Sequence, residues 1–249
     1  MKHSERRHLK DNELAIALAQ ANEWRAQNQG RVGVAVGAVV LVAVAVFGFM
    51  AWRNSVNARA QTMLAEAMVV GDARVTPPTP VPDPSSNASP GAPVQPPNSY
   101  PTEQAKLEAL LPKFVATADT YPSTEAGRTA RYHAAATLVG LGRFDEAIAQ
   151  YDRVVADGSG LLSQMARLGK AEAQLRGTKY DAAIASFKEL SERTDAGLPK
   201  EAMLLELARA YRLAGKPEDA RKTLTQIVEQ HADTPSASEA RSELEKLKG

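Results

Sequence analysis

Cysteine is absent from this 249-residue sequence, so the side chains that could do chemistry are histidines, carboxylates and arginines. The absence excludes disulfides, thiolate metal sites, a cysteine nucleophile and the lipidated cysteine of a lipoprotein. His3 and His8 form a weak metal-binding pair, but no further ligands accompany them. His133 and His231 are isolated, and we expect His133 to pack inside a helical domain. The sequence therefore predicts no metal site.

No motif in the sequence predicts catalysis. It has no H-E-x-x-H, no G-x-S-x-G and no glycine-rich loop able to cradle phosphate; the GSG at 158–160 indicates a turn. Carboxylates such as Asp145, Glu146, Glu239 and Glu243 occur at helix starts and on solvated faces. The net charge of +1 argues against a broad basic surface for nucleic acid. We therefore predict a protein without enzymatic activity or a cofactor.

Residues 32–52 form an uncharged apolar run without proline. A helix of this length spans roughly 30 Å, the thickness of the hydrocarbon layer of a bilayer. Apolar regions of signal peptides are shorter, about 7–15 residues. The run therefore predicts a transmembrane helix that anchors the chain. The alternative is a signal peptide removed near Ala60, where Ala58-Arg59-Ala60 is an A-x-A-like triplet.

Basic residues are concentrated before the apolar run. Only Arg53 and Arg59 follow it closely. The positive-inside tendency therefore places the N-terminus in the cytoplasm and the rest of the chain on the far side. The preceding basic residues are Lys2, Arg6, Arg7, Lys10, Arg25 and Arg31.

Three glycines of the predicted membrane helix, Gly33, Gly37 and Gly48, lie on one stripe. Gly33 and Gly37 make a G-x-x-x-G pair, which lets a partner helix approach closely. Such glycines are also simply common in membrane helices, so helix pairing and a purely compositional origin both stand as interpretations.

The remaining sequence divides by composition. We predict a charged helical tail in the cytoplasm (1–31), a helix continuing from the membrane (53–74), a proline-rich linker (75–101) and a folded domain (102–249). The linker holds 10 of the chain's 15 prolines, which disfavour helix and inner strand. Such a segment favours polyproline-like shapes with a reach of up to roughly 80 Å. We expect a semi-rigid spacer that holds the domain away from the membrane; a docking motif for proline-binding modules is the alternative.

The domain from residue 102 onward has apolar residues at helical spacing, divided by glycine and proline into pieces of roughly 12–20 residues. Three of its stretches are alike. They are GRFDEAIAQYDRVV from Gly142, GTKYDAAIASFKEL from Gly177 and GKPEDARKTLTQIV from Gly215. The middle stretch carries one extra residue. The similarity of these three stretches predicts a repeat architecture.

These stretches resemble the tetratricopeptide repeat, a pair of helices of 34 residues. The resemblance implies an all-α fold, with one N-terminal transmembrane helix and an α-solenoid of about three helix pairs between flanking half-repeat helices. The first flanking element, around Glu103–Thr120, resembles only the second helix of a repeat. Ser236–Lys248 resembles a terminal capping helix.

The resemblance also implies a binding surface, because in this family the first helix of each pair lines a groove. Arginine there can pair with acidic groups of a bound segment. Each of these residues is otherwise interpreted as an ordinary exposed helix residue. By position the groove residues are Tyr132, Ala136, Arg167, Ala171, Leu205, Arg209 and Arg212.

The whole layout resembles the ancillary subunit of the bacterial SecYEG translocon, and the repeats resemble those of the periplasmic cell-division coordinator. The resemblance implies a single-pass protein of the bacterial inner membrane with its repeat domain in the periplasm. It implies a scaffold that binds other proteins or peptides, such as the translocon, periplasmic chaperones or envelope proteins. The alternative is a periplasmic or secreted repeat binding protein, released by cleavage near Ala60.

Overall fold

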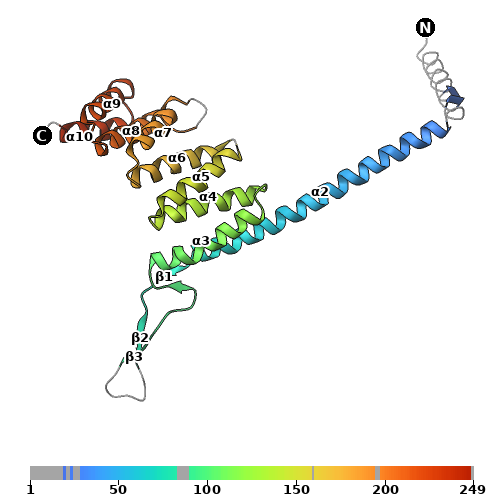
Figure 1. Ribbon diagram of the computed structural model, residues 1–249, viewed down its shortest axis with the longest axis horizontal. Coiled ribbons are helices and arrows are strands. Elements are labelled where there is room, and N and C mark those ends of the chain that lie inside the picture. Colours follow the sequence, from blue (N-terminus) through green and yellow to red (C-terminus); the bar gives the residue numbers. More distant parts are fainter. Residues whose placement is uncertain are drawn as a thin grey trace, which may run out of the picture. The chain divides into compact units, whose positions relative to one another are not determined.

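The computed structural model describes residues 19–20, 23–24, 29–82, 90–158, 160–193 and 197–247 (Figure 1). His3, His8 and most of the expected tail lie outside these residues. The helices with defined bounds are α2 (Gln29–Gly71), α3 (Glu103–Thr120), α4 (Glu125–Gly140), α5 (Phe144–Ala156), α6 (Leu161–Arg176), α7 (Tyr180–Glu192), α8 (Lys200–Leu213), α9 (Pro217–Gln230) and α10 (Pro235–Lys246). The strands are β1 (Arg74–Val75), β2 (Thr79–Pro82), β3 (Pro90–Val94) and β4 (Ser99–Tyr100).

Helix α2 contains the apolar run. It has 43 residues, which corresponds to about 65 Å. Its most apolar window has a mean hydropathy of 2.7, and no residue of that window is buried. Val34, Leu41 and Phe47 each expose more than 70% of their surface. Length and composition make α2 a candidate membrane span.

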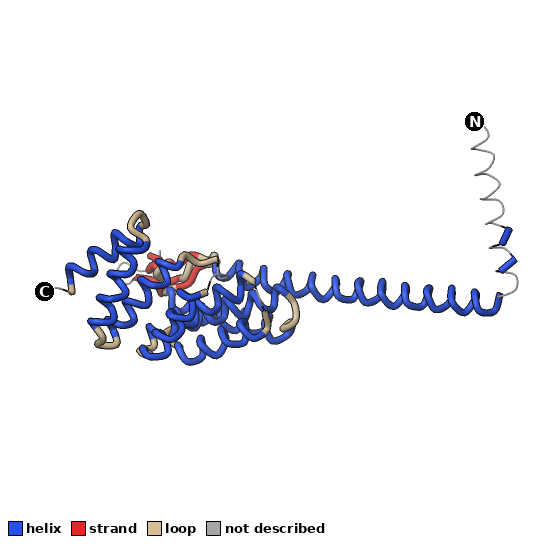
Figure 2. The backbone as a smooth tube through the Cα atoms, turned by 90° about the horizontal axis from the view of Figure 1, so that it is seen from above, coloured by secondary structure: helices blue, strands red, loops and turns tan. Residues whose placement is uncertain are grey.

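The chain divides into two compact units, residues 1–55 and 56–249. In the second unit each helix from α3 to α10 contacts the next one along the chain (Figure 2). The helices form three consecutive pairs, α4 with α5, α6 with α7 and α8 with α9, and α10 packs on α9 and α8. This arrangement confirms the predicted all-α solenoid with three helix pairs.

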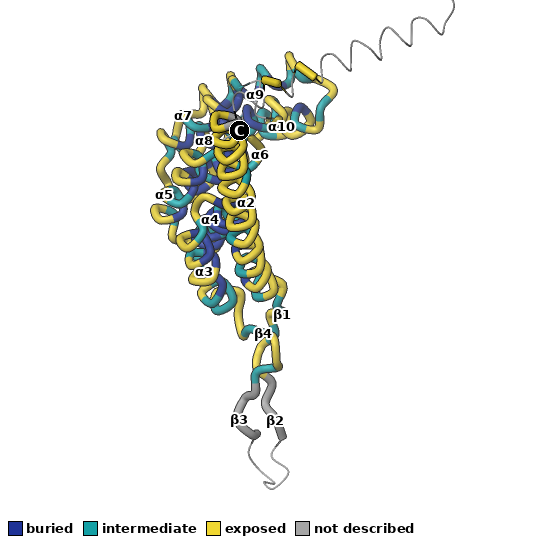
Figure 3. Tube along the Cα trace, turned by 90° about the vertical axis from the view of Figure 1, so that its right-hand side faces the viewer, coloured by how far each residue is buried: buried dark blue, intermediate teal, exposed yellow. Residues whose placement is uncertain are grey.

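Alanines fill the positions where these helices cross. Ala135, Ala147 and Ala166 are fully buried in one core cluster, with Tyr151 and Val154 between them. A second cluster, around Phe187 in α7, contains further buried alanines from α6 to α10. Buried positions accordingly run along the inside of the helix stack in Figure 3. An alanine side chain lets two backbones approach, and the larger side chains fill the space beside it.

The turns inside the three pairs share one backbone conformation. Gly142 and Gly215 have φ values of +73° and +71°, and Thr178 takes the same left-handed position at +59°. The middle repeat therefore contains no extra residue, contrary to the sequence-based prediction, because Thr178 and not Gly177 is equivalent to the two glycines. The same hydrogen bond closes each turn, from Arg143 N–H to Leu138 O, from Lys179 N–H to Gln174 O and from Lys216 N–H to Tyr211 O, at 2.8–2.9 Å.

A salt bridge repeats from one pair to the next beside these turns. Lys179 Nζ lies 2.6 Å from Asp145 Oδ1, and Lys216 Nζ lies 2.7 Å from Asp181 Oδ1. In both cases the lysine lies at the start of the second helix of one pair. The aspartate lies in the first turn of the second helix of the pair before it. These exposed pairs contribute little energy, but their repetition marks the register of the stack.

The C-terminal part of α2 packs on the helix stack. Ala60 and Ala67 are fully buried, although the membrane-like part of the same helix is exposed. Ala67 and Leu64 share a cluster with Leu110 and Phe114 of α3. Residues 56–71 thus supply the first helix that the half repeat at α3 was expected to lack. The expectation that α3 resembles the second helix of a repeat agrees with this packing, and the compact unit that contains the array begins at residue 56.

The proline-rich segment connects these two packed helices. β1 pairs in parallel with β4, and the backbone N–H of Thr76 donates to Tyr100 O at 2.9 Å. Gln95 Nε2 also donates to Thr76 O, at 3.0 Å. Between these contacts β2 pairs with β3 as an antiparallel ribbon. Because both ends of the segment meet, the expected extended spacer of up to roughly 80 Å is not formed.

A buried charge at residue 67 tests the contact between α2 and α3. We expect Ala67→Asp to lower the unfolding free energy of the array by about 2–4 kcal/mol, because the carboxylate would be buried without a partner. Ala58→Asp, on the exposed side of the same helix, is the matched control with the same change in helix propensity. Thermal unfolding followed by circular dichroism measures both variants. Equal melting temperatures would contradict the contact.

The left-handed threonine provides a second test. We expect Thr178→Gly to stabilise the array by about 0.5–1 kcal/mol, because the strain of a β-branched residue at this φ exceeds the entropy cost of glycine. The reverse change, Gly215→Thr, should destabilise by a comparable amount or more. Urea unfolding gives both values, and a less stable Thr178→Gly variant would show that the turn conformation is assigned wrongly.

Candidate binding surface

The first helices of successive pairs form a continuous row of polar side chains. We call this row the first-helix face, and it consists of Tyr132, Glu172, Glu206, Arg209, Arg212 and Glu243. Its members come from α4, α6, α8 and α10. Electrostatic interactions connect Tyr132 with Glu172, Glu172 with Glu206, and Arg212 with Glu243. Each of the six has a carboxylate or guanidinium neighbour on a different helix, so the face depends on the stacking of the pairs.

Tyr132 begins the row on α4. Its ring lies edge-on to Tyr151, with centroids 5.7 Å apart, and to His133 at 5.6 Å. Burial and the nearby Glu172 carboxylate both raise the pKa of Tyr132. The position of Tyr151 depends on Gly169, because a Cβ there would lie 2.5 Å from its ring. Tyr132 is therefore held by packing, with part of its surface still accessible.

A cavity of about 380 Å³ lies between α6 and α8. Its walls carry two carboxylates, Glu172 and Glu206, and two guanidinium groups, Arg176 and Arg209. Burial and the Glu206 charge raise the pKa of Glu172 more than the two arginines lower it. The Arg176 guanidinium carbon lies 5.5 Å from the centroid of the Phe144 ring. The cavity thus contains a carboxylate whose ionised form is poorly compensated.

A second cavity, of about 240 Å³, lies between α8 and α10 and shares Glu206 and Arg209 with the first. Arg212 Nε lies 3.9 Å from Glu243 Oε2. A hydrogen bond from Lys246 and, secondarily, the charges of Lys246, Arg212 and Arg209 lower the pKa of Glu243. The two cavities together form one polar groove along α8.

The two predicted arginines lie in this groove, together with Leu205. Arg209 is 59% and Arg212 is 46% exposed, so both are accessible. Each already has a carboxylate nearby, since Arg209 Nη1 lies 3.7 Å from Glu206 Oε2. The expected basic groove is therefore a groove of mixed charge. Glu206 and Glu243, which sequence reasoning did not place there, balance the arginines.

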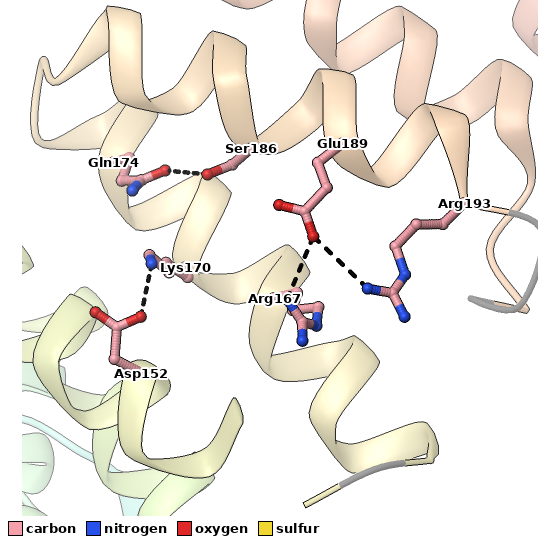
Figure 4. Close-up of polar contacts among 7 residues, drawn as sticks. All are labelled: Asp152, Arg167, Lys170, Gln174, Ser186, Glu189 and Arg193. Carbon is pink, nitrogen blue, oxygen red and sulfur yellow. Dashed lines mark hydrogen bonds and ion pairs between the residues drawn. The ribbon is translucent and has the colours of Figure 1, made fainter. Parts of the chain in front are cut away.

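Two predicted groove residues lie elsewhere. Ala171 is fully buried in the core cluster around Phe187, so it packs and cannot line a groove. Arg167 is turned toward α7, where its Nη1 lies 3.4 Å from Glu189 Oε1 (Figure 4). The accessible side of α6 is formed by Glu172 and Arg176 instead. Ala136 is exposed on α4, but no cavity described here includes it.

Figure 4 shows the polar contacts around Arg167 on α6. Lys170 on the same helix lies 2.6 Å from Asp152 of α5, and Gln174 accepts a hydrogen bond of 2.8 Å from Ser186 of α7. These contacts connect α6 to the second helices on both sides. This part of α6 is a polar seam between helix pairs and is distinct from the first-helix face.

The remaining sequence-based site predictions have different outcomes. At Gly33, Gly37 and Gly48 a Cβ would meet nothing within 4 Å, and pairing with a second membrane helix stays a prediction. His133 stacks on Phe114 with centroids 5.2 Å apart, and burial lowers its pKa, in agreement with a packing role. Within the described residues no group of three or more metal-ligating side chains comes together.

Family models of the tetratricopeptide repeat match residues 132–197 and 174–244. This part of the chain therefore matches the tetratricopeptide repeat in sequence as well as in its helix pairs, and we call it the tetratricopeptide-repeat array. The two matches together span the three helix pairs from within α4 to α10. Tetratricopeptide repeats generally mediate protein–protein interactions, and they are typically scaffolds without enzymatic activity.

Two solved structures are similar to the chain. One is a Podosopora anserina protein described as kinesin light chain nearly identical TPR-like repeats, and the other is a single-substitution variant of it. Each is 18% identical, covers 57% of this chain and 77% of its own, and has a TM-score of 0.48 or 0.47. No curated protein sequence matches the chain.

The raised pKa of Glu172 predicts a pH-dependent effect on stability. A carboxyl group whose folded-state pKa is raised destabilises the fold when ionised, so the penalty is present above that pKa and absent below the ordinary value of about 4.3. Glu172→Gln should therefore raise the melting temperature at pH 7.5. The increase should be smaller than about 2–4 °C, which is the change that 1 kcal/mol produces in a domain of this size. The gain should vanish near pH 4. Glu192→Gln, on the exposed end of α7, is the control. A gain that persists in acid would contradict the electrostatic cause.

Proposed function

We propose that the chain is a membrane-anchored scaffold that binds other proteins through the first-helix face of its tetratricopeptide-repeat array. The observation that carries this proposal is the groove along α8, where two adjoining cavities share Glu206 and Arg209. The groove is open to solvent, has apolar walls from Leu205 and Leu213, and presents both signs of charge. Such a surface suits a polypeptide segment, because main-chain and side-chain polar groups both find partners.

The anchor is the apolar part of α2, which supports residence in a membrane. Its exposed valine, leucine and phenylalanine side chains would be unfavourable in water and are suited to lipid. The excess of basic residues before the run supports an N-terminus in the cytoplasm and an array on the opposite side. The layout is similar to single-pass proteins of the bacterial inner membrane with a periplasmic repeat domain. Translocon components, periplasmic chaperones and envelope proteins are therefore the proposed partners.

The released form is a less favourable alternative. Cleavage near Ala60 would need the triplet Ala58-Arg59-Ala60 to be extended and accessible. In the structure this triplet lies inside α2, and Ala60 is fully buried. Its removal would also separate residues 56–60 from the packed unit that begins at Val56. The buried helix therefore favours the anchored form.

Site-specific photocrosslinking tests the binding surface. A photoreactive amino acid in place of Leu205 lies in the groove, whereas the same residue in place of Lys188 lies on the exposed side of α7. In intact membranes we expect adducts with one or a few proteins from position 205 and not from position 188. Deleting residues 32–52 should move the protein from the membrane fraction to the soluble fraction. Adducts from position 188 alone would place the binding surface on the second helices.

A further inference from the structure

The cavity between α6 and α8 has chemistry that selects one kind of side chain. We propose that it receives a lysine or arginine of the bound segment, held between the carboxylates of Glu172 and Glu206. This proposal rests on the proposed function, since it specifies the partner of the same groove. It differs from the sequence-based expectation of an acidic partner for Arg209 and Arg212.

Glu172 provides the first argument. In the described part of the chain, no lysine or arginine nitrogen is paired with its carboxylate within 4 Å, whereas Glu206 has Arg209 at 3.7 Å. Burial and the charge of Glu206 oppose ionisation of Glu172, and the raised pKa reflects this balance. A cation from a partner would relieve the repulsion between the two carboxylates. Binding energy of this kind is available only to a basic group.

The two arginines of the cavity give the second argument. Arg176 lies over the face of Phe144, with its guanidinium carbon 5.5 Å from the ring centroid. Arg209 is opposed by Glu206 and contributes to the charge around Glu243. Both guanidinium groups thus have favourable partners in the protein itself. An acidic ligand would have to compete with these partners. A basic ligand would meet a Glu172 carboxylate that Arg176 and Arg209 influence only from beyond ion-pair distance, among the residues that the structure describes.

Tyr180, at the start of α7, supplies the aromatic component of the cavity wall. Tyr132 of α4 has a pKa raised by burial and by the nearby Glu172 charge, but it does not line the cavity. Ammonium and guanidinium groups combine attraction to a carboxylate with attraction to an aromatic face. The cavity volume of about 380 Å³ accommodates a side chain of this size. Charge, aromatic surface and volume therefore agree on a long basic side chain.

Fluorescence anisotropy with defined peptides tests the proposal. The probes are two fluorescein-labelled peptides of alanine, serine and leucine that differ only in two central residues, arginine in one and glutamate in the other. Each is titrated with the full chain in detergent micelles. We expect the arginine peptide to bind more tightly, and the double variant Glu172→Gln, Glu206→Gln to weaken its binding about tenfold. Glu192→Gln combined with Glu229→Gln, on exposed positions of α7 and α9, should leave binding unchanged.

The outcomes are distinct from those of the crosslinking experiment. Tighter binding of the glutamate peptide, binding of neither peptide, or equal loss in the control variant would each overturn the basic-side-chain proposal. Adducts from position 205 would still support the groove in that case. Failure of the groove itself would appear instead as adducts restricted to position 188. Melting temperatures of both double variants show whether loss of binding reflects loss of fold.

Discussion

The close approach of helices at buried alanines is the constraint on which the array depends. Ala147, Ala183 and Ala220 occupy equivalent positions of the three pairs, and each is at most 1% exposed. A larger side chain at any of them would separate two backbones and displace the next pair as well, because the pairs contact only their neighbours. The spacing of the first helices follows from this packing, and so does the spacing of the charges that they carry. The groove along α8 thus depends on these small residues, and Ala220 is itself part of its wall.

The polar groove has a mixed electrostatic character for the same reason. Arg212 and Glu243 are 31 positions apart in sequence, yet the stacking of α10 on α8 brings them to 3.9 Å. Glu172 and Glu206 come from neighbouring pairs and lie in one cavity. Two like charges in such proximity have no structural benefit, because each raises the cost of ionising the other. A positive charge on a bound partner would lower the cost of ionising Glu172 and Glu206.

The fold could be predicted from sequence because it depends on local signals. The glycine turns, the first-turn acids and the alanine spacing each specify a helix pair without reference to distant residues. The site could be predicted only in part. Arg209 and Arg212 were found in the best-matched repeat, but Ala171 was assigned in place of Glu172. An error of one residue turns a helix by about 100°, which exchanges a buried side for an exposed one. The carboxylates opposite the arginines come from other pairs and are juxtaposed only by tertiary packing.

The pairing of α2 with α3 was missed for a different physical reason. Its apolar stripe of Ala60, Leu64 and Ala67 lies on the same helix as the longer apolar run of the predicted membrane span. The sequence indicated that the helix continues past Arg53, but not that this stripe packs on α3. Thr178 was misassigned because glycine is the usual residue at positive φ, and Gly177 stands next to it. In both cases the sequence contained the relevant residues, but a stronger neighbouring signal masked them.

The proline-rich connection has a consequence for the order of events during synthesis. The other pairs close across three residues, whereas α2 and α3 are separated by residues 72–102. Closing the longer loop costs about 2 kcal/mol more in chain entropy. The segment 56–71 also leaves the ribosome well before its partner helix, so its buried stripe has nothing to pack on for a time. The stripe on residues 56–71 therefore stays uncovered until residues 72–120 have been synthesised, a longer wait for a partner helix than in the other three pairs.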